Sequence, residues 1–562
     1  MYQSKGSVNG LRATFNYAPP ATRDDNHDDN RPFEPHSPAS PDLDCGLRIH
    51  VHAKESPNGE TSLHLPNPTL IVLLDDDVDR VNEKDNSRYL LLFSGDPVVE
   101  KSSRPGGLKV ADVVPNYKPG RFWLTSPPQA LKDALFFSRR EHPAWLDVAG
   151  GKSELTVVLS TAGGDGGGRS KAEVLYQSFV RPVLREIGLI ESICGKPDCI
   201  GSYPIARYNV IYTRSHDTIK DFITSKFSSS PRRCVSQQDQ TILLLSGDTS
   251  LFELLNALPT PLSSYASASK VHLSVLPTGT GNALCSSIYL NQHPLSAFLL
   301  GSPKKLPLFH TTFSPGSRLL SQSGKRHSIP ASGLYGAVVL SWAFHASLVA
   351  DSDASHYRRK YPGPQRFQVA ARENLDPHPH LYNGRITVQR QPDGPWEDLQ
   401  QNLKDEDRGY WYFLATLVSR LEETFVINPD GRPLDGKLRV VHFAKLQHPA
   451  EQPSSPASAP AEEHSGAAQS VIRTMHAAYD GGKHVELPGV GYERGGVEAV
   501  KVEVHEGDYS SEAAGGLDKE RNKGRWRRIC IDGAIIEVEK GGWVEVRNIP
   551  EGLEGVHIIW RK

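Results

Sequence analysis

The chain has 562 residues, a formal net charge of −2 and a pI near 6.9. This balance gives no electrostatic reason to expect a polyanionic partner, which argues against nucleic-acid binding. With 38% hydrophobic residues the chain can bury a substantial core, and its length predicts about two or three domains.

The six cysteines are scattered, which favours a reducing, cytoplasmic setting over a disulfide scaffold. Cys194 and Cys199 have a spacing that zinc sites use, but no second Cys/His pair follows, so we predict ordinary thiols and no protein-held metal. The N-terminus has no basic segment followed by an apolar one, and the most apolar window, residues 336–350, is too short to span a bilayer. Any membrane contact is expected to be peripheral.

The N-terminal third divides into two regions by composition. Residues 1–45 are rich in Asp, Asn, Pro and Ser and predict a disordered tail. In residues 46–150 short apolar runs alternate with Pro, Gly and Asp turns, which predicts a small β-rich accessory region.

Residues 151–330 change character, because apolar runs now alternate with helical patterns. The predicted strands are residues 155–160, 208–213, 241–246 and 271–277, and the predicted helices are residues 171–187, 217–224, 250–258 and 282–288. Strands that are apolar throughout and alternate with helices indicate a parallel sheet covered on both faces. Ligands of such sheets collect at the carboxyl ends of the strands.

Residues 331–562 read as strands separated by loops, which predicts an all-β domain. Two polar stretches interrupt it. We interpret residues 447–468 and 507–523 as flexible insertions.

Three loops at predicted strand ends can hold phosphate. The first, residues 160–169, contains Gly163 and Gly164, whose backbone N–H groups can approach phosphate oxygens. A mobile glycine linker is an equal alternative for this loop.

The second loop carries Ser246, Gly247, Asp248 and Thr249. Asp248 can take a proton from an incoming hydroxyl or hold a magnesium ion. The alternative is a simple turn followed by a capping box of Ser250 and Glu253.

The third loop is the segment PTGTGN, with Gly279, Thr280, Gly281 and Asn282. Two glycines between hydroxyl residues bring N–H and O–H donors to a helix N-terminus, which suits a triphosphate. Asn282 can instead merely cap the following helix.

The order of these motifs resembles the catalytic domain shared by diacylglycerol, sphingosine and ceramide kinases. That family has a glycine-rich first loop, a T-R-x-x-H stretch, a GGDGT-like loop before an E..N.L helix, and a PxGTGN loop. The matching segments are residues 160–168, 213–216, 246–258 and 277–282. The nearby string GGDGG at residues 163–167 is not the GGDGT equivalent, because the E..N.L helix follows Ser246.

Residues 341–353 resemble the stretch that begins the family's lipid-binding subdomain, and residues 363–367 resemble its Arg-containing end. Residues 429–438 resemble the P…DGKL segment, and residues 530–533 the late DGE motif. The resemblance implies an α/β fold with an NAD kinase-like parallel-sheet nucleotide domain, a β-sandwich lipid-binding domain, and the β-rich region at the N-terminus.

The same resemblance implies a kinase that uses ATP and Mg²⁺ to phosphorylate a hydroxyl of a sphingoid base, ceramide or diacylglycerol. Asp248 would be the general base or a metal-linked carboxylate, and Arg366 would neutralise phosphate charge, with Arg358 or Arg359 assisting. Nucleotide contacts are implied for Gly163, Gly164, Thr213, Ser246, Gly247, Thr249, Glu253, Gly279, Thr280, Gly281, Asn282, Arg366, Asp532 and Gly533. Substrate contacts are implied for Ser347 and Asp351.

Three departures cluster at the proposed chemistry. Thr249 stands where the family has glycine, Ser347 where it has aspartate, and Ala534 where it has the Glu of DGE. They favour an alternative in which the chain is a weak or inactive pseudokinase that binds lipid or nucleotide. A soluble-substrate kinase of the NAD kinase kind is a further alternative.

Two other features are left out of catalysis. His345 and Trp342 lie in an apolar run and are interpreted as core or pocket wall. The basic segment 523–528 can touch anionic lipid head groups or form a solvated strand edge.

Overall fold

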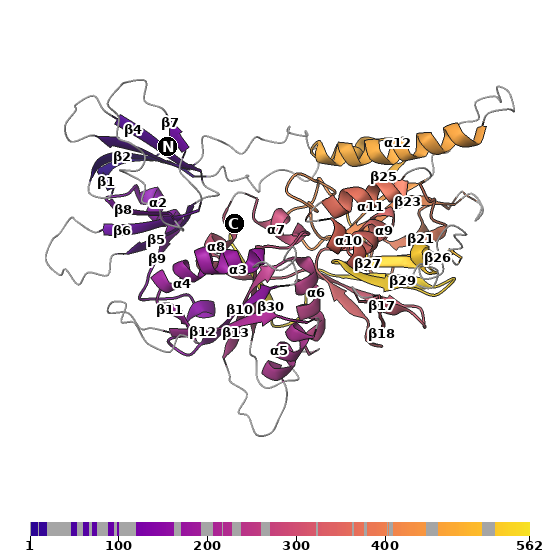
Figure 1. The fold of residues 1–562 in the computed structure, drawn as a ribbon, viewed down its shortest axis with the longest axis horizontal. Coiled ribbons are helices and arrows are strands. Elements are labelled where there is room, and N and C mark those ends of the chain that lie inside the picture. The colour runs from indigo at the N-terminus through magenta and orange to yellow at the C-terminus, as the bar shows by residue number, and fades with distance from the viewer. Residues whose placement is uncertain are drawn as a thin grey trace.

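The computed structural model describes most of the chain. The described residues are 2–8, 11–19, 46–52, 60–66, 70–75, 88–94, 98–100, 120–161, 170–192, 206–215, 217–227, 238–259, 270–290, 292–321, 324–361, 363, 365–375, 379–401, 403, 408–444, 459–507 and 523–562. Within them, an N-terminal sheet, a central α/β unit and a two-sheet β-sandwich lie in sequence across the molecule (Figure 1).

The N-terminal sheet has nine described strands in the order β7-β4-β3-β2-β1-β8-β6-β5-β9. They are β1 (Tyr2–Val8), β2 (Leu11–Ala18), β3 (Gly46–His52), β4 (Glu60–Pro66), β5 (Leu70–Asp75), β6 (Arg88–Phe93), β7 (Val98–Glu100), β8 (Gly120–Thr125) and β9 (Phe136–Phe137). Helix α2 (Gln129–Leu135) buries Leu131 and Leu135 in the same core as Phe15 and Phe122. The outer face of this sheet packs on the α/β unit through Ile71 and Val72.

The predicted disordered tail is wrong for residues 2–8 and 11–18, which form β1 and β2. Ala13, Phe15 and Tyr17 are buried while the residues between them are more exposed, so this short segment has the period of a half-buried strand. The composition of residues 1–45 is polar on average, so this short alternation is not evident from it. The strand that pairs with β2 is β3, which lies beyond residue 45. The rest of the tail, residues 20–45, lies outside the described residues.

The central sheet has the order β11-β12-β10-β13-β14-β30-β15. Its strands are β10 (Ser153–Ser160), β11 (Leu189–Glu191), β12 (Ala206–Thr213), β13 (Asp239–Ser246), β14 (Val271–Pro277), β15 (Ser302–Lys305) and β30 (Val556–Trp560). All neighbours pair in parallel except β15, which is antiparallel to β30. The predicted parallel sheet is therefore confirmed.

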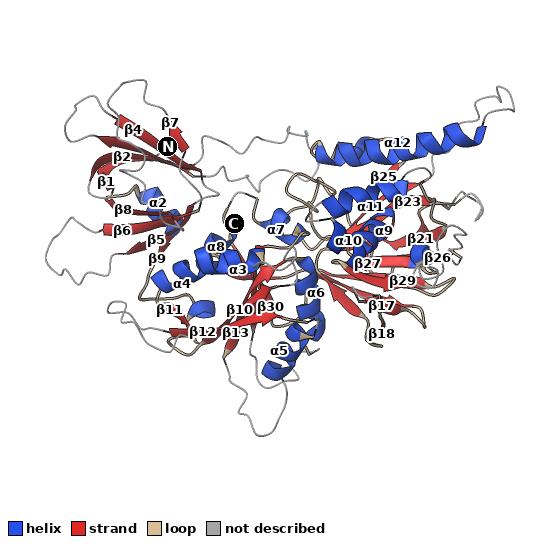
Figure 2. Cartoon of the chain, viewed as in Figure 1, coloured by secondary structure: helices blue, strands red, loops and turns tan. Residues whose placement is uncertain are grey.

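Helices cover both faces of this sheet (Figure 2). One face carries α3 (Lys171–Leu175), a π-helical turn (Tyr176–Val180), α4 (Arg181–Glu186) and α8 (Pro294–Leu300); the other carries α5 (Thr218–Phe227), α6 (Asp248–Ala257) and α7 (Ala283–Ile288). Leu155, Val157 and Leu159 of β10 face the first layer, and Val158 faces the second. Burial on both faces explains the continuous apolar runs.

The sandwich consists of two antiparallel sheets whose facing side chains form one core around Phe309, Trp342 and Val544. The first has β16 (Leu308–Phe313), β19 (Leu334–Gly336), β21 (Gly384–Gln389), β22 (Trp396–Asp398), β26 (Ala499–Val504) and β29 (Trp543–Ile549). The second has β17 (Arg318–Leu320), β18 (Arg326–Ser328), β20 (Val339–Ala343), β23 (Tyr410–Thr416), β24 (Arg439–Ala444), β25 (Val490–Tyr492), β27 (Arg528–Ile531) and β28 (Ala534–Glu537).

Helices accompany the second sheet of the sandwich (Figure 1). They are α9 (Phe344–Ser352), α10 (Ser355–Lys360), α11 (Gln365–Leu375) and α12 (Ala459–Tyr479). The flexible insertion predicted at 447–468 is wrong for residues 459–468, which lie in α12. Val471, Thr474 and Ala478 are buried at helical spacing and dock α12, and the Ala- and Glu-rich segment before them extends the helix. Residues 447–458 and 508–522 lie outside the described part of the chain.

The predicted boundary at residue 330 also needs correction. Strands β16 to β18 belong to the sandwich although they precede residue 330, and β30 lies in the central sheet although it is near the C-terminus. Strand pairing is non-local, so a change in the sequence pattern does not locate where the chain crosses between sheets.

Candidate active site

The loops expected to bind phosphate meet at one edge of the central sheet. Ser160 pairs with Thr213, and Ser246 pairs with Pro277, so the carboxyl ends of β10, β12, β13 and β14 are aligned. The Thr161 N–H donates to Thr213 Oγ1 (3.1 Å), and the Thr278 N–H donates to the Ser246 carbonyl (3.2 Å). Gly163 and Gly164 of the first loop lie outside the described residues.

Gly247 and Gly279 bring the second and third loops into direct backbone contact. A Cβ on Gly279 would lie 2.5 Å from Gly247 Cα, and a Cβ on Gly247 would lie 2.6 Å from the Gly281 carbonyl oxygen. Both distances are shorter than any side-chain carbon tolerates, so glycine is required at both positions for close packing. The Asp248 N–H completes the junction by donating to the Gly281 carbonyl (3.3 Å).

Asp248 is the buried carboxylate at this junction, with 8% of its surface exposed. It accepts hydrogen bonds from the N–H groups of Ala283 (2.7 Å) and Leu284 (3.3 Å), the first residues of α7. Burial raises the pKa of Asp248 to about 6, although these two hydrogen bonds oppose the rise. A carboxylate in this state can accept a proton near neutral pH.

Both helix-capping alternatives drawn from the sequence are wrong. Asn282 makes no cap to α7; its side chain accepts from the Gly279 N–H (3.1 Å) and donates to the Gly279 carbonyl (2.8 Å). Helix α6 begins at Asp248, so Ser250 lies inside it and accepts a hydrogen bond from Ser246 Oγ (2.5 Å). Asn282 therefore shapes the third loop, and the long-range residue Asp248 caps α7.

Glu253 lies one turn further along α6, and its pKa rises to about 7, first through burial and then through Asp217. The following Asn256 links α6 to the sandwich. Its amide donates to the Tyr335 carbonyl (2.8 Å) and accepts from the Tyr335 N–H (2.8 Å). Asn256 is the Asn of the E..N.L pattern, but nothing in the pattern itself indicates this contact with the sandwich.

Arg366 connects the third loop to α9. Its Nη2 donates to Thr280 Oγ1 (3.1 Å) and lies 3.3 Å from Asp353 Oδ1, and the residue is 8% exposed. Arg358 Nη2 lies 3.1 Å from the same oxygen. Two guanidinium groups therefore share one carboxylate beside the Thr280 hydroxyl.

Asp532 and Gly533 form a turn that reaches α6. Asp532 has φ of +48° and accepts from the N–H groups of Ala337 (2.7 Å), Val338 (3.1 Å) and Val339 (2.8 Å). Burial raises its pKa to about 7, and the charge of Asp248 adds to the rise.

Thr249, which replaces the expected glycine, directs its hydroxyl at Gly533. Gly533 has φ of +89°, and a Cβ there would collide with Thr249 Oγ1. The Thr249 side chain thus packs on the sandwich turn.

The two residues expected to bind substrate lie on α9 and already have partners. Ser347 Oγ accepts from Tyr382 Oη (2.7 Å). Asp351 pairs with Arg525 (2.7 Å) and Arg528 (2.9 Å). The solvated-edge and membrane-contact interpretations of the basic segment are therefore wrong for these two arginines, whose guanidinium groups turn inward toward α9. No local signal could have revealed this pairing, because more than 170 residues separate the partners.

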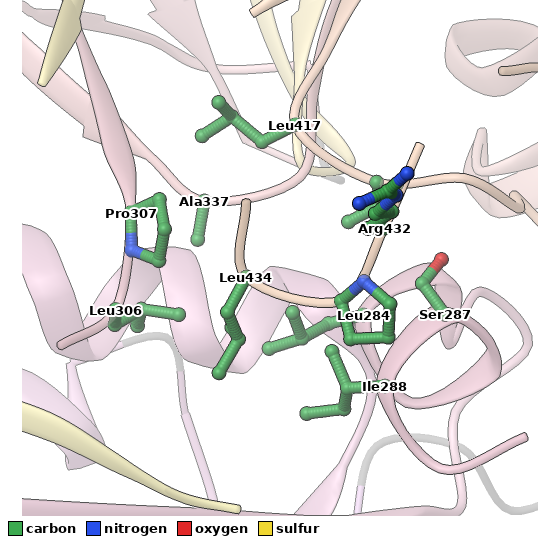
Figure 3. Close-up of a pocket in the computed structure, with 11 residues that line it drawn as sticks. Leu284, Ser287, Ile288, Leu306, Pro307, Ala337, Leu417, Arg432 and Leu434 are labelled. Carbon is green, nitrogen blue, oxygen red and sulfur yellow. The ribbon is translucent and has the colours of Figure 1, made fainter. Parts of the chain in front are cut away.

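An apolar pocket lies behind α7 (Figure 3). Leu284, Ser287 and Ile288 of α7 line one side, and Leu306, Ala337 and Leu434 line others. The pocket lies where α7 packs between the central sheet and the sandwich. Across the described residues no group of three or more His, Cys, Asp or Glu side chains could hold a metal ion. No helix in the described part of the chain is long and apolar enough to cross a membrane.

The decisive comparison concerns the segment that contains β13, α6, β14 and α7. Residues 210–305 match the Diacylglycerol kinase catalytic domain. The match confirms, over these residues, the resemblance predicted from the order of the loops. The diacylglycerol kinase catalytic domain match includes Asp248 and both glycine loops, and it ends before the sandwich.

Solved structures give a weaker likeness, and no curated protein matches the sequence. One is titled "A putative diacylglycerol kinase from Bacillus anthracis str. Sterne", with a TM-score of 0.40, 10% identity, and 73% of this chain and 97% of that chain covered. Another, a diacylglycerol kinase from the same organism, has a TM-score of 0.38 and 9% identity over the same shares.

Proposed function

We propose that the chain is an ATP-dependent lipid kinase that phosphorylates a hydroxyl group of a sphingoid base, ceramide or diacylglycerol. The observation that carries the proposal is the junction of the second and third loops. There the buried carboxylate of Asp248, the N-terminus of α7 and the Thr280–Arg366 pair converge at the carboxyl edge of a parallel sheet. This edge is where such sheets bind nucleotides.

The proposed roles follow from the contacts. Backbone N–H groups of the glycine loops and the guanidinium of Arg366 would bind the phosphates, with Arg358 assisting. The acceptor oxygen would bond to the γ-phosphorus as the bond to the bridging oxygen breaks, so that ADP leaves and Asp248 takes the hydroxyl proton. Purely peripheral contact with a membrane would suffice to deliver the lipid.

Mg²⁺ fits this site when it arrives with the nucleotide. The buried carboxylates of Asp248 and Asp532 are both engaged by backbone N–H groups, and no three-ligand cluster exists among the described residues. Mg²⁺ commonly takes one or two carboxylates together with substrate phosphates and water. The ion would offset charge on the phosphates.

A second candidate, a pseudokinase that binds nucleotide or lipid without transfer, is supported by specific contacts. Thr249 packs against Gly533, Ser347 is hydrogen-bonded to Tyr382, and Asp351 is held by two arginines. Nucleotide binding without phosphate transfer to any lipid of a panel would favour this candidate over the kinase.

The substitution Asp248→Asn tests the kinase proposal. Asparagine cannot take the hydroxyl proton, so transfer from labelled ATP to lipid should fall about 10² to 10⁴-fold. Its oxygen can still accept from the Ala283 N–H, so the thermal unfolding midpoint should change little. Asp393→Asn, in an exposed turn, is the matched control and should keep full activity. Full activity in Asp248→Asn would refute the assigned role.

A further inference from the structure

Helix α7 has six residues, and a helix this short depends on tertiary contacts for its position. Its first turn is joined to Asp248, whose carboxylate accepts from the Ala283 and Leu284 N–H groups. Near its end, Ser287 Oγ accepts from the Arg420 N–H (3.0 Å) and donates to the Arg420 carbonyl (3.1 Å). A shift of α7 would therefore move the Asp248 carboxylate or weaken its hydrogen bonds.

The last turn of α7 is also held by the end of the chain. The Trp560 indole N–H donates to the Ile288 carbonyl (3.1 Å), and the Tyr289 hydroxyl donates to the Ile559 carbonyl (3.3 Å). Carbonyls in the last turn of a helix have no partner within that helix, so Trp560 supplies a donor that α7 itself lacks. Because β30 pairs with β14, it anchors the carboxyl end of α7 to the central sheet.

Arg561 extends this contact to the N-terminal sheet. Its Nη1 donates to Ser296 Oγ in α8 (3.1 Å), and its Nη2 donates to the Ala134 carbonyl in α2. Gln292, between α7 and α8, donates to the Arg561 carbonyl (2.6 Å). The C-terminus accordingly lies between the N-terminal sheet and α7 (Figure 1). Residues 559–561 thus touch both α7 and the helix that packs in the N-terminal core.

We propose that residues 559–561 are a link through which the N-terminal sheet positions α7, and with it the Asp248 carboxylate. Coupling between distant parts of a protein is carried by packed elements and hydrogen bonds of this kind. Trp560 and Arg561 are then positioning residues, because each acts on Asp248 through α7. The consequence for catalysis rests on the lipid kinase function proposed above, whereas the link itself does not.

The reactivity of Cys285 tests the link without any substrate. Cys285 lies inside α7 and is 4% exposed, so a thiol reagent reaches it only when the helix moves. Trp560→Phe keeps an aromatic ring but removes the donor to the Ile288 carbonyl. Alkylation of Cys285 in the native full chain, followed by peptide mass spectrometry, should be at least threefold faster in this variant. Cys530, buried in β27, is the internal control, and its rate should not change.

Trp396→Phe is the matched control variant, because Trp396 is half-exposed on the edge strand β22, and it should leave both rates unchanged. Two results would overturn the link. One is an unchanged Cys285 rate in Trp560→Phe. The other is an equal acceleration of Cys285 and Cys530, which would show that the substitution destabilises the whole protein.

Arg561→Met tests the connection to the N-terminal sheet, since it removes both side-chain hydrogen bonds and leaves Trp560 in place. The Cys285 rate should rise at least twofold. Arg561→Lys can reach one of the two acceptors and should restore part of the protection. Arg385→Met is the control, because Arg385 pairs with Asp398 in the sandwich, and its rate should match that of the natural protein. An Arg561→Met rate equal to the control would refute the role of the N-terminal sheet.

The pH profile of lipid phosphorylation tests the effect on Asp248. The N–H groups of α7 lower the pKa of this carboxyl group, so a displaced α7 should raise that pKa. Asp532, in the turn between β27 and β28, and the Cys285 thiol interact with the charge of Asp248, and Trp560→Phe alters neither. The ratio of kcat/KM at pH 5 to kcat/KM at pH 8 should therefore fall at least twofold in Trp560→Phe.

A loss of activity in Trp560→Phe with an unchanged pH profile would refute the positioning of Asp248 by Trp560, because a merely structural role lowers activity equally at every pH. If the natural protein phosphorylates no lipid, the kinase function fails, and the Cys285 rates alone decide the link. Faster Cys285 alkylation in both variants would then support it, and unchanged rates would overturn it.

Discussion

Asp248 and Asp532 are a pair of buried carboxylates, one at the start of α6 and the other in the turn between β27 and β28. Each receives backbone N–H bonds, and burial raises the pKa of the first to about 6 and of the second to about 7. The charge of each disfavours the charge of the other, so a proton or a nearby cation stabilises the site.

The raised pKa of Asp532 predicts how the stability of the protein changes with pH. Its pKa is higher in the folded than in the unfolded protein, so the folded state binds more protons between about pH 4 and 7. Stability contributed by this residue must fall as pH rises through that window. Asp532→Asn removes the titration, so the unfolding midpoint of the natural protein minus that of the variant should decrease from pH 4 to 7. A difference that is flat or increasing would contradict this assignment.

At the scale of elements, the junction proposed to be catalytic depends on two loops that touch through their backbones. Helix α6 begins at Asp248 and α7 begins at Ala283, and the Asp248 side chain joins the two starts. Neither helix carries a local side-chain cap there. The contact between the two loops and the capping of α7 therefore depend on the same residue, Asp248.

Gly279→Ala should separate these loops, because its new methyl group meets Gly247 backbone atoms at 2.5 and 2.8 Å. We expect the free energy of unfolding to fall by about 1 to 3 kcal/mol, and nucleotide binding to be lost. Gly281→Ala is the matched control, since its methyl group has only Asp248 Oδ2 nearby, at 3.9 Å. Thermal unfolding with and without ATP measures both. Equal midpoints for the two variants would show that close packing is not the reason for glycine at position 279.

At the scale of the whole molecule, the chain returns to its central sheet at the end. Strand β30 pairs in parallel with β14 and antiparallel with β15, and it buries Val556, Ile558 and Ile559. The sandwich is thereby inserted between strands of the α/β unit. The α/β unit and the sandwich are held together by a shared sheet as well as by the α6–sandwich contacts.

Removal of residues 556–562 should therefore destabilise the α/β unit. Three buried aliphatic side chains contribute roughly 6 kcal/mol together, which is comparable to the stability of a typical domain. The truncated chain should lose its cooperative unfolding transition and nucleotide binding. Removal of the exposed Lys562 alone serves as the control and should preserve both. Undiminished ATP binding by the longer truncation would contradict the proposed dependence on β30.

The sequence by itself determined the alternation of strands and helices in residues 151–330, the motif order and the candidate residues from Ser246 to Asn282. These features are local, because backbone geometry fixes the period of an apolar pattern and glycine is needed where backbones approach closely. It missed β1 and β2, whose short apolar alternation lies within a polar segment.

Only the tertiary structure decided which side chains share a partner. Asp248 caps α7 from 35 residues away, and Asp532 accepts hydrogen bonds from backbone N–H groups between β19 and β20, nearly 200 positions earlier. Asp351, expected to meet substrate, instead meets Arg525 and Arg528. A carboxylate binds whichever N–H group or cation the packing of distant elements brings to it, and sequence spacing carries no record of that meeting.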